Sequence, residues 1–376
     1  MLLVVAGGLT TVGCAGIRNM PEGGTGGTVV DGTIFVYPAV GQSSGGFSCT
    51  PAVTQSKLVA LDMDGKRLWE VPLEDVEPAT GIFSCNAGAS PVVVYGNPAV
   101  SGNLVYVGGY NGKIFAVNAD SGVLRWVYPR QGNLKPIVGG TVIDGNSLYF
   151  GGVDGKVYAL DAETGDEKWV FETGDKIWAS PVVSGDSLFI GSFDNKFYAL
   201  NTADGSQRWA FEAEGTITST ALVHNGTVYI GSFDRHIYAL DEADGSLKWK
   251  FTADKWFWTR PVVYNNTVYA GCFDGKVYAL DAENGNKIAQ FDLESAVAAW
   301  PVMVNDLIIA ASDQGKVYAI DGVTNQRKWD IELGEQVYAP LATANNVVYV
   351  YTEDQNLYAL NAESGVRLWS LPLNGK

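Results

Sequence analysis

Tyr158-Ala-Leu-Asp161-Ala-Glu-Thr-Gly165-Asp-Glu-Lys-Trp169 decides the fold of this 376-residue chain, because altered copies of it recur along almost the whole sequence. From this copy onward the motif returns every 40 residues. Ala289 replaces the final tryptophan once, although the preceding Tyr278-Ala-Leu-Asp281 keeps the register. With two copies upstream, the motif occurs eight times. The tryptophans that end the copies are Trp69, Trp126, Trp169, Trp209, Trp249, Trp329 and Trp369.

A 40-residue period of short strands and turns is typical of a radial repeat. In the copy that spans 180–211, Ser180-Pro-Val-Val is followed by three further strand-like runs, with Gly and Asn at the turns between them. No window shows the 3.6-residue periodicity of a helix. The sequence therefore predicts an all-β, eight-bladed β-propeller of four-stranded antiparallel blades, with strands from 28 to 372.

The predicted third strand of each copy indicates how the blades pack. Alternate side chains of a strand face opposite sides, so Tyr198 and Leu200 share one face and Ala199 lies on the other. A sheet with one bulky face and one small face stacks well on a copy of itself. We expect the tryptophans to be structural docking residues that fill the space between sheets, where truncation of a buried indole costs about 3–5 kcal/mol.

The pattern Ala-x-Asp/Asn-x-x-x-Gly-x-x-x-Trp resembles the tryptophan-docking repeat of pyrroloquinoline-quinone (PQQ)-type β-propellers over roughly residues 27 to 372. That family includes quinoprotein alcohol dehydrogenases and the BamB-like lipoprotein of the outer-membrane barrel assembly machinery. The resemblance implies eight blades. It also implies either a PQQ-dependent enzyme or a protein-binding scaffold.

The N-terminal 1–14 is a short apolar run that ends at Gly13-Cys14. It is too short to cross a bilayer as a mature helix, and it resembles the end of a bacterial lipoprotein signal. No basic residue precedes the run, and Thr11 stands where such signals usually carry Leu. We expect lipidation at Cys14, a flexible tether over 15–27 and an exported, lipid-anchored protein. The alternative is an artefactual start with an idle cysteine.

Two insertions, over about 38–55 and 74–96, interrupt the early repeats. Each carries a Phe-Ser-Cys sequence, which contains Cys49 and Cys85 respectively. An exported protein allows a disulfide between them, and the alternative is two free thiols. Cys272 stands where another copy has Ser232 and is predicted to be a small buried residue.

Composition and motifs argue against several functions. The net charge of −16 disfavours nucleic acid as a partner. Gly41-Gln-Ser-Ser-Gly45 matches a nucleophile elbow, but it lies in a loop of an all-β repeat rather than at a strand-to-helix turn. His224 and His236 are expected on the surface or in turns. Catalytic residues and a metal site are not predicted.

A ligand or partner site is predicted where the chain enters the first strand of each blade. In a propeller these strands surround the central channel, and connecting loops form the rims. An aromatic rim with one cation suits a flat ligand or a peptide, whereas the alternative is packing between blades. The candidates are Trp178, Ser180, Thr218, Thr220, Trp256, Trp258, Arg260, Trp300 and Tyr338.

Three functions follow from these observations. The first is a non-catalytic, membrane-tethered, monomeric propeller that binds envelope proteins or peptides, without a cofactor. The second is a PQQ- and calcium-dependent dehydrogenase, although the adjacent cysteines of such enzymes are missing from this sequence and the repeated Asp-x-x-x-Gly is poor in oxygen ligands for Ca²⁺. The third is a sensor that binds a small ligand at the aromatic rim.

Overall fold

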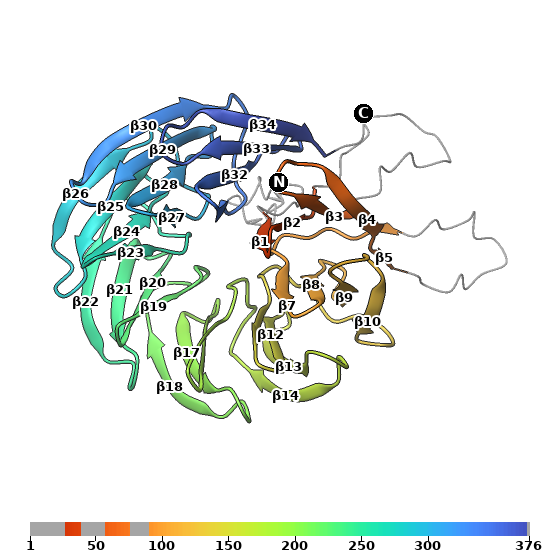
Figure 1. Cartoon of the computed structure of the whole chain (residues 1–376). Coiled ribbons are helices and arrows are strands. Elements are labelled where there is room, and N and C mark those ends of the chain that lie inside the picture. The colour runs from red at the N-terminus through yellow and green to blue at the C-terminus, as the bar shows by residue number, and fades with distance from the viewer. Residues whose placement is uncertain (1–26, 39–56, 76–89, 374–376) are drawn as a thin grey trace, which may run out of the picture.

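Eight four-stranded antiparallel sheets follow one another around a ring in the computed structural model, which describes residues 27–38, 57–75 and 90–373 (Figure 1). In every sheet the strands are hydrogen-bonded in the order of the sequence or its reverse. No helix occurs in these described ranges. The predicted eight-bladed β-propeller is confirmed.

The strand bounds show how regular the repeat is. Blades 1 and 2 contain β1 (Thr28–Val30), β2 (Thr33–Val36), β3 (Lys57–Asp62) and β4 (Arg67–Pro72), then β7 (Ala99–Ser101), β8 (Leu104–Gly108), β9 (Ile114–Asn118) and β10 (Leu124–Tyr128). Between them lies a small ribbon of β5 (Glu74–Asp75) and β6 (Ser90–Pro91). Blades 3 and 4 contain β11 (Val142–Asp144), β12 (Ser147–Gly151), β13 (Lys156–Asp161) and β14 (Glu167–Glu172), then β15 (Val182–Ser184), β16 (Ser187–Gly191), β17 (Lys196–Asn201) and β18 (Gln207–Glu212).

The second half of the ring repeats this arrangement. Blades 5 and 6 contain β19 (Leu222–His224), β20 (Thr227–Gly231), β21 (His236–Asp241) and β22 (Leu247–Thr252), then β23 (Val262–Tyr264), β24 (Thr267–Gly271), β25 (Lys276–Asp281) and β26 (Lys287–Asp292). Blades 7 and 8 contain β27 (Val302–Val304), β28 (Leu307–Ala311), β29 (Lys316–Asp321) and β30 (Gln326–Glu332), then β31 (Ala342–Ala344), β32 (Val347–Tyr351), β33 (Asn356–Asn361) and β34 (Arg367–Pro372).

The first strand of each blade is shorter than its sequence suggests. The predicted strand that begins at Ser180 starts at Val182 instead. Pro181 has no N–H to donate to a neighbouring strand, and the Ser180 hydroxyl accepts a hydrogen bond from the Gly140 N–H at 2.7 Å instead. The residues just before each first strand therefore belong to the connection between blades, and strand alternation does not set where their side chains point.

Each tryptophan of the repeat lies on a glycine of the following blade. The Trp169 indole Nε1 donates to the Thr202 carbonyl at 2.9 Å. Its ring covers Gly205, where a Cβ atom would lie 2.6 Å from Cε3. Gly205 also has a φ of 73°, a conformation that side chains rarely adopt. The position is therefore restricted to glycine both by its backbone and by the indole.

The same pair recurs at seven of the eight seams and closes the ring. The pairs are Trp69 on Gly122, Trp126 on Gly165, Trp169 on Gly205, Trp209 on Gly245, Trp249 on Gly285, Trp329 on Gly365 and Trp369 on Gly65. The last pair joins blade 8 to blade 1, and there the indole donates to the Met63 carbonyl at 3.2 Å. Because every blade is one continuous segment of chain, side-chain contacts of this kind close the ring.

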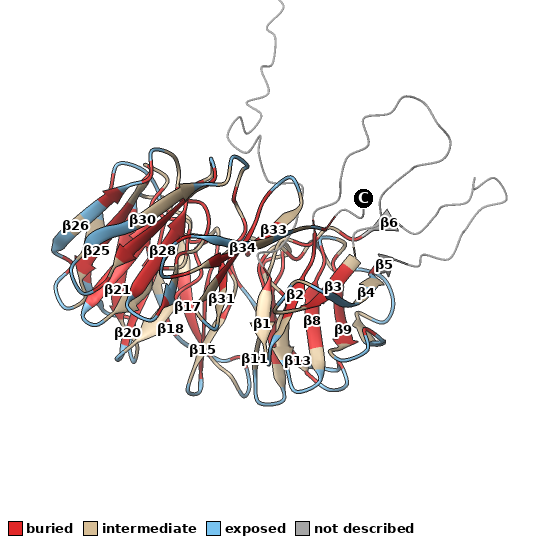
Figure 2. Cartoon of the chain, turned by 45° about the horizontal axis from the view of Figure 1, so that its top comes forward, coloured by how far each residue is buried: buried red, intermediate tan, exposed pale blue. Residues whose placement is uncertain are grey.

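The alanine of the repeat provides room for the indole. Ala159 pairs directly with Trp169 across the β13–β14 ladder, and Ala199 pairs with Trp209 in the next blade. The buried side chains form eight clusters, each shared between neighbouring blades; one contains Phe197 of blade 4 and Val228 of blade 5. Figure 2 shows buried residues along the inner strands and exposed residues at the hairpins and on the outer strands.

The seam between blades 6 and 7 lacks both partners of the pair. Ala289 stands in place of the tryptophan, and it pairs with Ala279 in the ladder. Asn325 replaces the glycine, with a φ of 52°. Its Oδ1 accepts a hydrogen bond from the Tyr269 hydroxyl at 2.7 Å. The asparagine is tolerated because no indole covers this position.

We expect Ala289→Trp and Asn325→Gly to be coupled. Tryptophan alone would collide with the Asn325 side chain, and glycine alone would remove the partner of the Tyr269 hydroxyl without adding a contact. Together they would recreate the pair of the other seven seams. A double-mutant cycle of unfolding free energies should give a favourable coupling of about 1 kcal/mol or more. Strictly additive effects would show that the tryptophan–glycine contact has no energetic role at this seam.

Candidate functional site

One face of the ring carries the four tryptophans that are not motif tryptophans. On this face, the connections between blades meet the turns between the second and third strands. Backbone hydrogen bonds tie the two together: Phe193 N–H donates to Lys176 O at 3.0 Å, and Phe273 N–H donates to Trp256 O at 3.1 Å. We call it the connection face. The four tryptophans on it are Trp178, Trp256, Trp258 and Trp300.

The turns of this face are held by an aspartate and a tyrosine. Asp194 Oδ1 accepts the Lys196 N–H at 2.9 Å, and Oδ2 accepts the Tyr198 hydroxyl at 2.6 Å. Burial and the Asp194 carboxylate raise the pKa of Tyr198, so the phenol stays protonated and keeps donating. The adjacent Phe193 is thereby fixed on the connection face.

Six aromatic side chains from three neighbouring blades and their connections meet in a continuous group, which we call the aromatic crescent. Trp178 contacts Phe193 edge-on at a ring-centroid distance of 4.7 Å. Trp258 lies 5.6 Å from Phe233 and 6.1 Å from Phe273. The crescent consists of Trp178, Phe193, Phe233, Trp256, Trp258 and Phe273.

The crescent is continuous because a small residue stands between two large ones. Trp178 and Trp258 occupy equivalent positions two blades apart, and their rings lie 6.3 Å apart. The equivalent position between them is Thr218, which is buried. Trp256 extends the crescent outward and is 39% exposed. Exposed apolar surface of this kind often marks a site of interaction.

Two cations accompany the crescent. The Lys176 ammonium lies 4.4 Å from the centroid of Phe193 and 5.2 Å from that of Trp178, within cation–π range. The Arg260 side chain is half-buried, and its Nε has no hydrogen-bond partner in the described structure. Burial lowers the pKa of its guanidinium, and no acidic side chain offsets the effect.

The aromatic character of this face ends at blade 7. The turn position filled by phenylalanine in blades 4 to 6 holds Asp313 in blade 7 and Glu353 in blade 8. Their N–H groups donate to Ala296 O at 2.8 Å and Gln336 O at 2.9 Å, so they occupy the same place in the turn. Burial raises the pKa of Tyr338, and the negative charges of Asp313 and Glu353 raise it further. One side of the face is therefore aromatic and cationic, and the other is acidic.

The structure brings together only some of the predicted site residues. Trp178, Trp256 and Trp258 belong to the crescent, and Arg260 follows Trp258 by two residues. The Ser180 hydroxyl accepts a hydrogen bond from the Gly140 N–H of the neighbouring connection, and the side chains of Thr218 and Thr220 are buried. Among the described residues, Trp300 and Tyr338 make no ring contact. Five residues of this face were not predicted from the sequence, although a phenylalanine repeated at one turn position was a signal; they are Phe193, Phe233, Phe273, Lys176 and Asp313.

The histidines and cysteines of the sequence are either structural or lie outside the described residues. His236 lies at the start of β21, directly after the turn that contains Asp234, and it is buried rather than exposed; its Nδ1 lies 3.1 Å from Asp234 Oδ1. His224 is half-exposed in β19 beside Asn225. Cys272 is buried, and burial raises the pKa of its thiol to about 12. Cys14, Cys49 and Cys85 lie outside the described residues.

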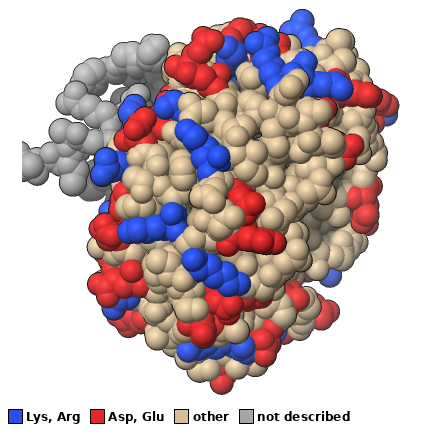
Figure 3. Space-filling model, turned by 90° about the vertical axis from the view of Figure 1, so that its left-hand side faces the viewer, with Lys and Arg blue, Asp and Glu red and all other residues tan. Residues whose placement is uncertain are grey.

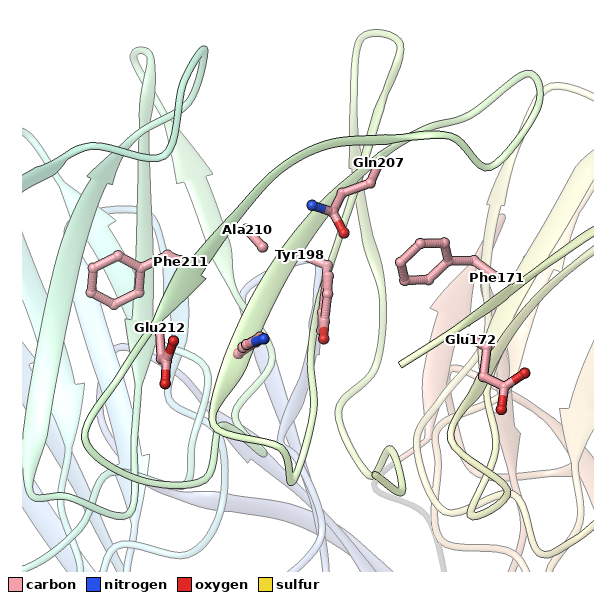
Figure 4. Close-up of a pocket in the computed structure, with 8 residues that line it drawn as sticks. Phe171, Glu172, Tyr198, Gln207, Ala210, Phe211 and Glu212 are labelled. Carbon is pink, nitrogen blue, oxygen red and sulfur yellow. The ribbon is translucent and has the colours of Figure 1, made fainter. Parts of the chain in front are cut away.

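A hollow of about 300 Å³ lies between blades 3 and 4 on the outer side of the ring, at strands β14, β17 and β18 (Figure 4). Its lining includes Phe171, Glu172 and Tyr198. The Phe171–Tyr198 contact recurs as Phe211–Tyr238 at the next seam. The hollow is therefore a feature of the repeated seam and does not single out one site. Figure 3 shows acidic and basic side chains interspersed on the outer side of the ring.

Neither a metal centre nor a membrane helix is found in the part of the chain that the structure describes. No three His, Cys, Asp or Glu side chains there are close enough together to hold a metal ion. The same residues contain no helix long and apolar enough to cross a membrane.

Comparisons with known proteins agree with the architecture. The family model described as the β-propeller of the beta-alanine-activating enzyme matches residues 87–341. No curated protein sequence matches the chain.

Three solved structures illustrate the fold. BamB from Moraxella catarrhalis is 18% identical, with a TM-score of 0.67 over 87% of this chain and 90% of its own. The computationally designed Ika8 protein is 15% identical, with a TM-score of 0.71 over 94% and 98%. Quinohemoprotein alcohol dehydrogenase from Comamonas testosteroni is 17% identical, with a TM-score of 0.63 over 74% and 67%. Identities this low show the fold alone.

We expect Trp256 to dominate the solvent-accessible tryptophan fluorescence. Acrylamide quenching should fall more in Trp256→Phe than in Trp300→Phe, because Trp300 is half-buried and the motif tryptophans are shielded in the seams. Steady-state Stern–Volmer plots of the two variants and the parent protein measure this. Equal quenching of all three proteins would contradict the exposure of the crescent.

Proposed function

This chain belongs to the β-propeller family of the beta-alanine-activating enzyme, and from that premise we propose that it is a non-catalytic scaffold that binds other proteins. Its place is the cell envelope, where a lipid on Cys14 tethers it. The partners are envelope proteins or peptides, and a role in outer-membrane protein assembly, similar to that of BamB-like propellers, fits this arrangement.

The observation that carries the proposal is the aromatic crescent on a rigid ring. Tryptophan and other large aromatic side chains dominate the binding energy of protein interfaces because they remove much apolar area from water. Trp256 presents such a side chain to solvent, and Tyr110 of blade 2, 45% exposed, presents another on the same face. The eight buried seams beneath keep these side chains in fixed relative positions, which lowers the entropy lost on binding.

The dehydrogenase alternative is tested by the residues that would hold its cofactor. A quinone of that kind needs calcium held by several oxygen ligands. No group of three acidic, histidine or cysteine side chains in the described ranges could supply them. On the connection face, the cation Arg260 follows the aromatic Trp258 by two residues, and the acidic Asp313 and Glu353 lie in two separate blades. This donor set does not fit a quinone with calcium, and we derive no reaction from it.

Affinity capture from envelope extracts tests the scaffold role. The full chain should recover a barrel-assembly protein, and Trp256→Ala should lower the recovery about tenfold, as expected for loss of an interfacial anchor. Leu247→Ala is the matched control, because Leu247 is an exposed apolar side chain on the outer strand β22.

Two results would contradict the proposal. One is recovery that Trp256→Ala leaves unchanged, which would place the interface elsewhere or make the capture non-specific. The other is a redox-active protein after incubation with PQQ and Ca²⁺, which would favour the enzyme.

A further inference from the structure

A strained arginine stands in one of the turns that carry the crescent. Arg235 follows Phe233 by two residues in the turn between β20 and β21, and its φ is 75°. This left-handed conformation is unfavourable for a residue with a Cβ, and arginine is not among the residues that adopt it readily. Backbone strain of this kind gathers at functional sites. Four other blades have glycine at the equivalent position, at Gly112, Gly155, Gly275 and Gly315.

The same turn position lies directly against the connection to the next blade. In blade 6, a Cβ atom on Gly275 would lie 3.2 Å from the Ser295 carbonyl oxygen. At the seam between blades 5 and 6 the residue that corresponds to Ser295 is Lys255. The Arg235 carbonyl also accepts a hydrogen bond from the Ala253 N–H at 3.0 Å, which holds the turn against this connection. The side chains of Arg235 and Lys255 therefore start from neighbouring backbone.

These two cations lack a counter-ion. Arg235 and Lys255 are both exposed, and neither pairs with a described carboxylate. Asp254, which precedes Lys255, bonds the Lys276 ammonium at 3.3 Å instead. Neighbouring positive charges repel each other, and an anion placed between them relieves the repulsion. The chain has 41 acidic residues, so the lack of a partner at this pair leaves room for an anion from outside.

An exposed ring adjoins the two cations. Trp256 directly follows Lys255 and is 39% exposed, and its ring centroid lies 5.7 Å from that of Phe233 and 5.6 Å from that of Phe273. At the other end of the crescent, the Lys176 ammonium has only aromatic rings as described partners. The crescent is therefore a continuous apolar surface with unpaired positive charge at both ends.

From these observations we propose that the crescent binds a segment of a partner protein in which acidic side chains flank aromatic ones. One carboxylate of the segment lies between Arg235 and Lys255, and a second lies at Lys176. The aromatic side chains of the segment pack on Trp256 and the rings beside it, edge-to-face or offset. Hydrogen bonds from charged donors to a carboxylate are among the strongest in proteins. The inference rests on the proposed scaffold role and names the chemistry of the partner.

Isothermal titration calorimetry of the full chain with three pentapeptides tests the proposal. The probe is Glu-Phe-Glu-Phe-Glu, acetylated and amidated at its ends, and the matched peptides carry glutamine or lysine in place of every glutamate. We expect the glutamate peptide to bind about tenfold or more tightly than the glutamine peptide, and the lysine peptide to bind most weakly. Non-specific attraction to a chain of net charge −16 would give the opposite order.

Variants locate the site on the ring. Arg235→Gly carries little risk to folding, because glycine is the residue of the equivalent turns. It should weaken the glutamate peptide about fivefold or more with a melting temperature that is unchanged or higher, since it removes the strain. Lys255→Gln should weaken the same peptide to a similar extent.

Two control variants should bind the glutamate peptide as the parent protein does. Gln355→Gly changes the same turn position in blade 8, where φ is 66°, and so relieves similar strain without removing a charge. Lys66→Gln removes an exposed cation from the hairpin between β3 and β4, on the opposite face of the ring.

Three results would overturn the inference. They are no binding of the glutamate peptide at millimolar concentration, a lysine peptide that binds as tightly, or unchanged binding in both Arg235→Gly and Lys255→Gln. If capture of an envelope protein still depends on Trp256 in any of these cases, the scaffold role stands and only the acidic character of the partner falls. If the glutamate peptide binds as expected and no protein is captured, the scaffold role falls and the peptide site remains.

Discussion

The contact between an indole and a bare glycine Cα is the constraint on which the rest of this structure depends. A flat ring approaches the next blade this closely only where no Cβ intervenes, and the glycine is also in the left-handed backbone region. At the one seam without an indole the glycine is absent too: Ala289 stands in place of the tryptophan, and Asn325 stands in place of the glycine. Each indole removes roughly 150–250 Å² from water, and seven of them fix the angle between neighbouring blades.

Because the seams hold the ring, the connection face is free to vary. The position of Trp178 is filled by valine, threonine, tryptophan, alanine and tyrosine in other blades, at Val138, Thr218, Trp258, Ala298 and Tyr338. None of these belongs to a tryptophan–glycine pair. Buried side-chain atoms without a hydrogen-bond partner in the described structure gather on the same face. A scaffold whose stability comes from the repeat can therefore carry an irregular and partly unsatisfied surface, which is where binding sites are expected.

The fold was predictable from the sequence because three features of the repeat all result from the packing of one blade on the next. They are the 40-residue period, the alternation around Ala199 and the seven tryptophans. The start of the first strands was not predictable, since Pro181 cannot donate to a neighbouring strand and Ser180 bonds the neighbouring connection, so β15 begins two residues later than the apolar pattern implies. The burial of His236 could not be predicted from its place beside a turn, because it depends on the contact with Asp234 two residues earlier. The repeat register placed Trp178, Trp258 and Arg260 on one face of the ring. Phe193 and Asp313 were missed because their contribution depends on which loops meet in space.

The central claim is that the glycine is required by the indole and not only by its own backbone. Gly245 and Gly226 both lie in hairpins of blade 5, with φ values of 74° and 70°. A Cβ on Gly245 would lie 2.5 Å from Trp209 Cε3, whereas one on Gly226 would meet nothing within 4 Å. Backbone strain is therefore common to both alanine substitutions, at about 1–2 kcal/mol. Chemical denaturation of Gly245→Ala and Gly226→Ala measures the difference directly: the account predicts a clearly larger loss of unfolding free energy for Gly245→Ala, and equal losses would contradict it.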